Sequence, residues 1–186
     1  MKRLFDITLS LFLIILLLIP LIIISFLILM DSGAPIIYNS KRIGFKSKKF
    51  LMPKFRTMKN GTIQVATSKM KKPYLNITRI GGFLRSYSLD ELPQLFLVLV
   101  GKMSFVGPRP LLFNQYKLIK KRQLHKIDFL VPGITGLAQV NGRDFLSDEK
   151  KIYFDQKYLK SKSFFLDIKI IFKTFLVIFK KSGIKH

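Results

Sequence analysis

Two adjacent carboxylates, Asp90 and Glu91, stand in the stretch Ser88-Leu89-Asp90-Glu91-Leu92-Pro93-Gln94. Acidic residues are scarce in this chain, which has 33 Lys+Arg against 10 Asp+Glu and a formal net charge of +23. A carboxylate pair can meet a phosphate ligand at a helix N-terminus when a metal ion or arginines offset the repulsion. A structural interpretation accounts for the same residues, because Ser88 followed by Glu91 has the pattern of a capping box. The two interpretations are compatible.

Four arginines are available to compensate these charges: Arg79, Arg85, Arg109 and Arg143. Arg109 has the most constrained setting, because Pro108 and Pro110 fix the backbone on both sides of it. A guanidinium held in place suits bidentate recognition of phosphate. A rigid turn that carries an exposed arginine explains these three residues equally well.

The composition limits the chemistry further. There are no cysteines, which excludes a disulfide framework, thiolate chemistry and cysteine-bound metal. His125 and His186 are the only histidines, which argues against a Ser-His-Asp triad or a histidine-rich zinc site. The basic excess points to a polyanionic partner: nucleic acid, an anionic membrane or phosphorylated small molecules. No nucleic-acid-binding motif and no Gly-rich nucleotide motif is recognisable.

The N-terminal segment is strongly apolar, and residues 7–30 carry no charged side chain. A helix of this length would measure roughly 36 Å at ~1.5 Å per residue, enough to cross a bilayer. No convincing cleavage site follows, so we expect the segment to be retained. Pro20 should kink or break the helix. Basic residues flank the segment on both sides, which favours a re-entrant helix–break–helix bent near Pro20; a straight span remains open.

The rest of the chain predicts short strands and basic helices. The expected elements are a strand-like run at Ile36-Ile37-Tyr38, a basic turn at Lys41-Arg42-Ile43-Gly44, a strand within Phe50 to Met58, a mobile loop and possible lid from Lys59 to Lys72, an apolar helix from Leu92 to Val100, a basic helix within Leu111 to Leu130, a strand from Leu137 to Val140 and an amphipathic helix from Phe164 to Lys181. Alternation places Lys54 and Arg56 on one strand face, and Pro53 predicts an edge position or a strand beginning. The two cations suit an anionic ligand or a solvated basic edge.

Six of these stretches together match one family. They are Lys2-Arg3-Leu4-Phe5-Asp6, Lys54-Phe55-Arg56-Thr57-Met58, Leu84-Arg85, Ser88 to Gln94, Met103 to Pro110 and Pro132 to Arg143. Their order along the chain is that of the family, and they cover nearly its whole length. The chain resembles bacterial sugar transferases, and it is similar to the small monotopic polyprenyl-phosphate phosphoglycosyl transferases, such as the bacillosamine-phosphate transferases.

The resemblance implies an enzyme that transfers a sugar 1-phosphate from a UDP-sugar to undecaprenyl phosphate, releases UMP and initiates glycoconjugate assembly with Mg²⁺ as cofactor. It implies that Asp90 is the nucleophile, forms a covalent phosphosugar intermediate and contacts Mg²⁺, and that Glu91 assists as an acid or base. The substrate-binding residues that we expect are Lys54, Arg85, Arg109 and Arg143.

The expected fold is α+β: a helix-rich monotopic membrane domain with a small β element and amphipathic interfacial helices. Residues 1–31 would form the re-entrant hairpin, and residues 32–186 the catalytic domain on the cytoplasmic face of the bacterial inner membrane. Anionic lipids of that membrane are expected partners, and nucleic acid is not.

Three positions depart from the family pattern: Ile19, Leu97 and Lys102. A membrane-tethered nucleic-acid-binding protein or a non-catalytic scaffold is the alternative, and neither the sugar, the pathway nor the oligomeric state can be read from the sequence.

Overall fold

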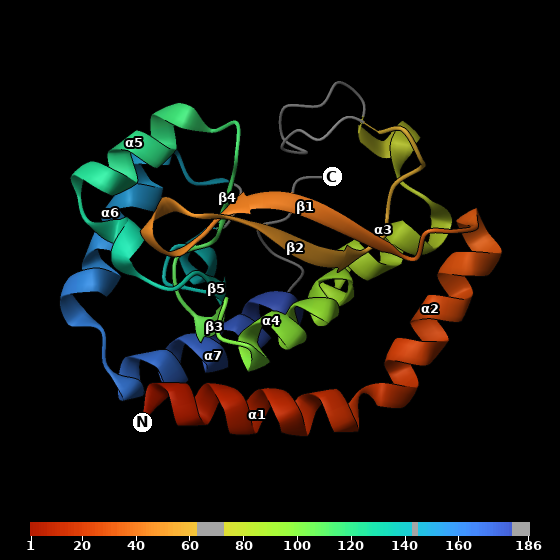
Figure 1. The fold of residues 1–186 in the computed structure, drawn as a ribbon, viewed down its shortest axis with the longest axis horizontal. Coiled ribbons are helices and arrows are strands. Elements are labelled where there is room, and N and C mark those ends of the chain that lie inside the picture. The colour runs from red at the N-terminus through yellow and green to blue at the C-terminus, as the bar shows by residue number, and fades with distance from the viewer. Residues whose placement is uncertain (63–72, 143–144, 180–186) are drawn as a thin grey trace.

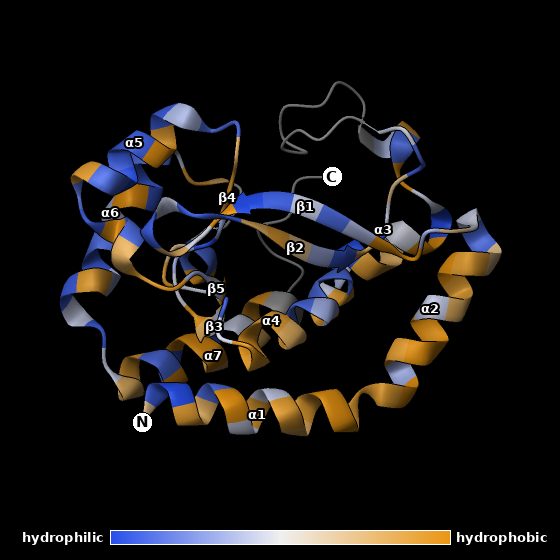
Figure 2. Ribbon diagram, viewed as in Figure 1, coloured by the Kyte–Doolittle hydropathy of each residue, from blue (hydrophilic) through white to orange (hydrophobic). Residues whose placement is uncertain are grey.

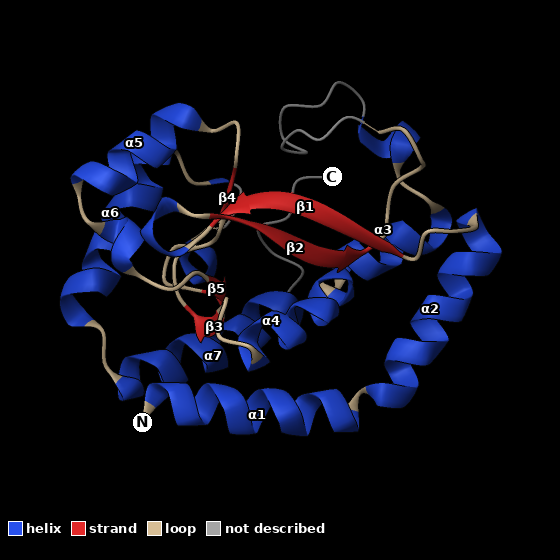
Figure 3. Cartoon of the chain, in the orientation of Figure 1, coloured by secondary structure: helices blue, strands red, loops and turns tan. Residues whose placement is uncertain are grey.

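The computed structural model describes residues 1–62, 73–142 and 145–179 and contains helices and two small sheets (Figures 1 and 3). The α-helices are α1 Lys2–Leu16, α2 Leu18–Ser32, α3 Arg79–Ser86, α4 Leu95–Leu99, α5 Tyr116–Leu124, α6 Asp148–Ser161 and α7 Phe164–Phe179. The strands are β1 Ile37–Ile43, β2 Lys49–Phe55, β3 Ser104–Val106, β4 Leu111–Leu112 and β5 Gly133–Thr135. Short 3-10 helices are η1 Phe45–Ser47, η3 Pro73–Asn76, η4 Leu89–Gln94, η5 Ile127–Phe129 and η6 Gln139–Asn141. The expected mixture of helix and strand is confirmed.

The larger sheet has the order β2-β1-β4, with β1 antiparallel to both neighbours. Pro53 lies in β2 at the edge of this sheet, as predicted, where its missing N–H leaves no gap in a central ladder. The predicted turn at Lys41 to Gly44 is wrong, because β1 continues to Ile43. The strand extends this far because Arg42 and Ile43 pair with β2 on one side and with β4 on the other.

The smaller sheet pairs β3 with β5 in parallel. Next to this sheet, Gly107 allows the chain after β3 to approach the chain before β5 closely. A Cβ on Gly107 would lie only 2.3 Å from the carbonyl oxygen of Val131. This contact brings the Pro108-Arg109-Pro110 loop against β5, and the amide of Gly133 donates to the carbonyl of Pro108 at 3.0 Å.

The apolar N-terminal segment forms two helices that meet at a 60° bend. The break falls at Leu17 and not at Pro20, which lies in the first turn of α2. A proline ring clashes with the carbonyl four residues earlier, here that of Leu16, so Pro20 interrupts the helix on its N-terminal side. Within the described ranges no single helix is long and apolar enough to cross a membrane; α1 and α2 together pass that test of length and composition as a bent pair.

The helix pair borders two adjacent sides of the molecule, with α1 along the bottom and α2 at the right in Figure 1. It packs on the rest of the chain through two apolar clusters. In the first, α1 contacts a core shared by β2, α4, β3, α6 and α7, which includes Met52, Val98, Val106, Tyr158 and Ile170. In the second, α2 packs on β2 and α3 through Ile24, Ile28, Phe55 and Leu84. The remaining faces of α1, α2 and α7 are apolar and exposed, in contrast to α5 and α6 (Figure 2).

Three predicted elements have different bounds or types. The apolar helix from Leu92 begins later, as α4, because η4 precedes it; the basic helix is confined to α5; and the stretch from Leu137 to Val140 leads into η6 and is not a strand. The predicted amphipathic helix from Phe164 is confirmed as α7 up to Phe179. Most of the predicted lid, residues 63–72, lies outside the described residues.

Candidate active site

Asp90 and Glu91 lie in η4, which packs against β2. The capping-box prediction is wrong in its side chains: Ser88 precedes η4 with a left-handed backbone, φ 58°, and makes no side-chain cap. The carboxylate of Glu91 instead accepts hydrogen bonds from Lys54 and Arg109, in which both donor and acceptor carry a charge. The helix start therefore presents both carboxylates to cations from other parts of the chain.

Lys54 reaches the pair from the adjacent strand β2. Its Nζ lies 2.7 Å from Oε1 of Glu91 and 3.3 Å from Oδ2 of Asp90. The side chain of Lys54 is 16% exposed, and those of Asp90 and Glu91 are 10% and 14% exposed. One ammonium thus bridges two mostly buried carboxylates.

Arg109 supplies the second cation, from the loop between β3 and β4. Its Nη2 lies 2.9 Å from the same Oε1 of Glu91, and its side chain is 44% exposed. The guanidinium has further donors beyond this one. Arg109 therefore contacts the acid pair while part of its side chain remains open to solvent.

Glu91 remains ionised in this arrangement. Burial would by itself raise the pKa of Glu91, but Arg109 and Lys54 outweigh it and hold that pKa well below the ordinary carboxyl range. A carboxyl in this state cannot donate a proton near neutral pH. Any proton transfer by Glu91 requires its two cations to be drawn away first.

Arg42 is a further cation of this region that the sequence analysis missed. Burial and the positive charge of Arg109 lower the pKa of Arg42 to about 10, and Glu91 opposes the shift, so the three groups lie within electrostatic range. The strand register could have revealed it: Tyr38 pairs with Lys54, and Arg42 lies four residues after Tyr38 on the same face of β1. Reading Lys41 to Gly44 as a turn hid this alternation.

The other predicted cations are placed differently. Among the described residues, the ion pairs of the acid pair come from Lys54 and Arg109. Arg85 lies half-buried near the end of α3, just before η4. Arg56 does not join Lys54 at the acids; its guanidinium donates to the carbonyls of Ser32 and Gly33 at the end of α2. Arg143 lies outside the described residues.

Comparison of the sequence with known proteins identifies the family of this chain. The model of the bacterial sugar transferase family matches residues 1–181. The chain belongs to the bacterial sugar transferase family. It is 37% identical over 186 residues to the uncharacterized sugar transferase EpsL of Bacillus subtilis (strain 168), covering 100% of this chain and 91% of that protein.

Two longer relatives carry more specific names. The chain is 40% identical over 201 residues to a UDP-galactose-lipid carrier transferase of Erwinia amylovora, covering 98% of this chain and 41% of that protein. It is 42% identical over 183 residues to a UDP-glucose:undecaprenyl-phosphate glucose-1-phosphate transferase of Klebsiella pneumoniae, covering 93% of this chain and 39% of that protein. The chain thus spans about two fifths of the length of these two relatives.

The carboxylates of this bacterial sugar transferase suit a Mg²⁺ ion that is bound partly by the protein and partly by substrate phosphates. Within the described part of the chain, no group of three or more Asp, Glu, His or Cys residues forms a closed metal site. Lys54 contacts Oδ2 of Asp90, and among the described contacts Oδ1 makes no hydrogen bond or ion pair. Mg²⁺ commonly binds one or two carboxylates and completes its shell with waters and substrate phosphates. Asp90 fits that role better than Glu91, because one cation contacts Asp90, at 3.3 Å, whereas two cations contact Glu91, at 2.7 and 2.9 Å.

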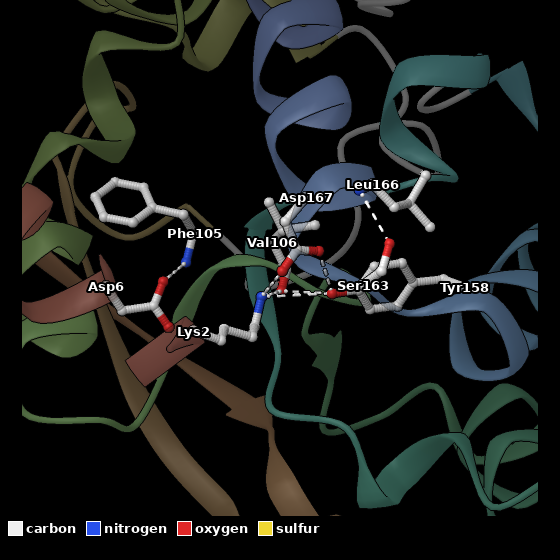
Figure 4. Close-up of polar contacts among 8 residues, drawn as sticks. All are labelled: Lys2, Asp6, Phe105, Val106, Tyr158, Ser163, Leu166 and Asp167. Carbon is white, nitrogen blue, oxygen red and sulfur yellow. Dashed lines mark hydrogen bonds and ion pairs between the residues drawn. The ribbon is translucent and has the colours of Figure 1, made fainter. Parts of the chain in front are cut away.

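A second polar cluster fixes the start of α1 away from the acid pair (Figure 4). Nζ of Lys2 lies 2.5 Å from Oδ2 of Asp167 in α7 and donates to the carbonyl of Val106 at 3.0 Å. The hydroxyl of Tyr158 in α6 donates to Oδ1 of Asp167 at 2.6 Å. One turn on, Asp6 accepts from the backbone N–H of Phe105 at 3.2 Å. These bonds tie the first residues of the chain to its last helices.

Proposed function

We propose that this protein is a Mg²⁺-dependent phosphoglycosyl transferase that moves a sugar 1-phosphate from a UDP-sugar to undecaprenyl phosphate and releases UMP. The observation that carries the proposal is the Asp90–Glu91 pair, held between Lys54 and Arg109 in a chain of the bacterial sugar transferase family. The names of the Erwinia and Klebsiella relatives supply the substrate classes, a UDP-sugar and a lipid carrier. They give no support to a nucleic-acid-binding or scaffold protein.

The chemistry that we assign to Asp90 has two steps. A carboxylate oxygen of Asp90 attacks the phosphorus that bears the sugar, and the bond from that phosphorus to the bridging oxygen breaks, so that UMP leaves with this oxygen. The phosphate oxygen of undecaprenyl phosphate then attacks the same phosphorus and releases the Asp90 carboxylate. Mg²⁺, when bound, would neutralise phosphate oxygens and lower the repulsion between these anions.

Lys54 and Arg109 would exchange partners when substrate binds. Both contact Glu91 in the structure, and both are suited to hold the diphosphate of a UDP-sugar. Phosphate oxygens on these cations would weaken their hold on Glu91, while its burial remains, and the pKa of Glu91 would rise towards the range useful for proton transfer. Glu91 would thereby acquire its acid or base role only in the loaded site.

We propose a position at the cytoplasmic face of the inner membrane, and the arrangement of the helix pair supports attachment to a membrane from one side. Its start is held by Asp167 through Lys2, and its end is held through Asp31, which accepts from the backbone N–H of Ile80 at 3.1 Å. Both ends therefore attach to one folded body, which supports a re-entrant hairpin over a straight span. The exposed apolar side chains of α1, α2 and α7, among them Phe12, Ile19, Phe26, Phe165 and Phe172, supply the surface that would enter an anionic leaflet.

The decisive experiment measures UMP release by the purified protein with Mg²⁺, undecaprenyl phosphate and a panel of UDP-sugars. We expect release with at least one UDP-sugar and a sugar-diphosphate lipid as the second product. The Asp90→Asn variant is the matched control, because it keeps the size of the side chain and removes its charge. A protein that is folded yet silent with every UDP-sugar would contradict the proposal.

A further inference from the structure

The backbone around Arg109 is fixed by three hydrogen bonds to three consecutive carbonyls. The carbonyl of Pro108 accepts from the amide of Gly133 at 3.0 Å. The carbonyl of Arg109 accepts from Nη1 of Arg122 at 2.8 Å, and that of Pro110 accepts from Nη1 of Arg42 at 3.2 Å. Two of the three donors are side chains brought from other elements, α5 and β1.

Arg122 is itself held from behind by a buried acid. Its Nη2 lies 2.7 Å from Oδ2 of Asp155 in α6, and the two side chains are 11% and 3% exposed. Burial raises the pKa of Asp155, and the charge of Arg122 opposes that rise. One planar guanidinium therefore joins a buried carboxylate to the main chain of Arg109, with each contact on a different nitrogen.

This arrangement matters because Arg109 contacts Glu91 from a partly exposed position. Its 44% exposure contrasts with the burial of Lys54, the other cation on Glu91. The side chain of Arg109 extends from a backbone that Arg122 helps to fix, and misplacement of a substrate-positioning group by about 1 Å can lower a rate on the order of 10²-fold. The bond from Arg122 to the Arg109 carbonyl therefore bears on where the Arg109 guanidinium lies.

We infer that Arg122 and Asp155 are positioning residues that aim Arg109 at Glu91 and at the substrate phosphates, without touching substrate themselves. The expected loss of kcat/KM rests on the proposed function. The expected displacement of the Arg109 guanidinium rests on the geometry alone. The inference predicts that the effect of removing the Arg122–Asp155 pair passes through the Arg109 side chain.

The test is a double-mutant cycle between the pair and Arg109. Arg122→Met/Asp155→Asn removes both charges, so no buried acid is left unpaired, and it should lower kcat/KM for the UDP-sugar roughly 10- to 100-fold. In an Arg109→Ala background the same two changes should lower it less than about threefold, because no guanidinium remains to be aimed. Lys121→Met is the matched control: it removes an exposed α5–α6 ion pair, 2.9 Å to Glu149, and should leave kcat/KM unchanged.

A crystal structure of the Arg122→Met/Asp155→Asn variant gives a second result that needs no activity. We expect the Arg109 guanidinium to leave hydrogen-bond distance of Glu91 while η4 keeps its place. An Arg109–Glu91 contact kept as in the parent chain would overturn the inference, as would an equal fold-loss in the Arg109→Ala background. If the parent chain releases no UMP, the proposed function fails, and this crystallographic comparison alone decides the inference.

Discussion

Replacing Lys54 by methionine should remove the ammonium that bridges the acid pair while preserving most of the length of the side chain. At the 2.7 Å contact with Glu91, the attraction is roughly 1.5 kcal/mol in water and about 6 kcal/mol at an effective dielectric constant of about 20. Both side chains are slightly exposed, so solvent screens part of this attraction, and we take its free energy as about 2–4 kcal/mol. The diphosphate of the substrate would lose a comparable attraction, which predicts a fall in kcat/KM of roughly 30- to 1,000-fold.

The assay is UMP release under conditions where the UDP-sugar is varied and undecaprenyl phosphate is saturating. Lys49→Met is the matched control, because Lys49 begins the same strand, carries the same charge and is exposed. Lys54→Arg should retain part of the activity, since its charge remains. A Lys54→Met rate within about threefold of the Lys49→Met rate would refute the assignment of Lys54 to phosphate binding.

The Lys54→Met variant should also change how the stability of the folded protein depends on pH in the acid range. The pKa of Glu91 lies below its ordinary value in the folded chain, so its contribution to stability is present above the unfolded pKa and is lost as the pH falls through the folded pKa. Burial raises that pKa and Arg109 and Lys54 lower it, so removing Lys54 raises the folded pKa and reduces the stability that ionised Glu91 contributes at neutral pH. Thermal unfolding midpoints of the parent chain and of Lys54→Met, measured from pH 7 downward, should therefore converge towards acid, because the parent chain has the larger contribution to lose. Parallel curves would show that Lys54 does not hold Glu91 ionised.

Three further predictions concern the covalent step, proton transfer and topology. With a UDP-sugar and Mg²⁺ but no lipid, the protein should release up to about one UMP per molecule and retain a phosphosugar on Asp90, detectable by mass spectrometry; wild-type turnover in Asp90→Asn would contradict this. Glu91→Gln should slow turnover roughly 10²- to 10⁴-fold, and loss of the alkaline or acidic limb of the pH–rate profile would show which proton it moves. A cysteine inserted after Met1 and one at Lys48 should be equally protected from an impermeant thiol reagent in intact cells, whereas labelling of the first alone would show a span. Pro20→Ala should shift the population towards that span.

Local chemistry was predictable from the sequence where one residue restricts the backbone. Pro53 indicated an edge strand, and two prolines singled out Arg109 as a constrained cation that the structure brings to Glu91. The helix break was foreseen from Pro20, but its place at Leu17 depends on how the proline ring acts on the preceding turn. The predicted alternation of Lys54 and Arg56 could not show that β2 ends at Phe55 or that these two long side chains go to different partners.

The misses concern partners that are far apart along the chain. Ser88 and Glu91 have a capping-box spacing, but Glu91 binds Lys54 and Arg109, and no local pattern indicates which competing bond is stronger. The turn predicted around Arg42 failed because Arg42 and Ile43 pair with β2 on one side and, on the other, with β4, about 70 residues later in the chain. Sequence patterns thus gave the residue types of the candidate site, and long-range contacts decided their arrangement.

The bond between Lys2 and Asp167 joins positions 165 residues apart, and it bears on the order in which the chain assembles. During synthesis α1 and α2 leave the ribosome before α7. Until α7 is made, the ammonium of Lys2 lacks its carboxylate, and in the proposed re-entrant arrangement the helix pair would enter the lipid on its own apolar surface. A chain released after Ser161 should therefore be extracted from membranes by alkaline carbonate more readily than one that extends to Phe179. Lys2 thus reaches its final partner only after α7 has been made.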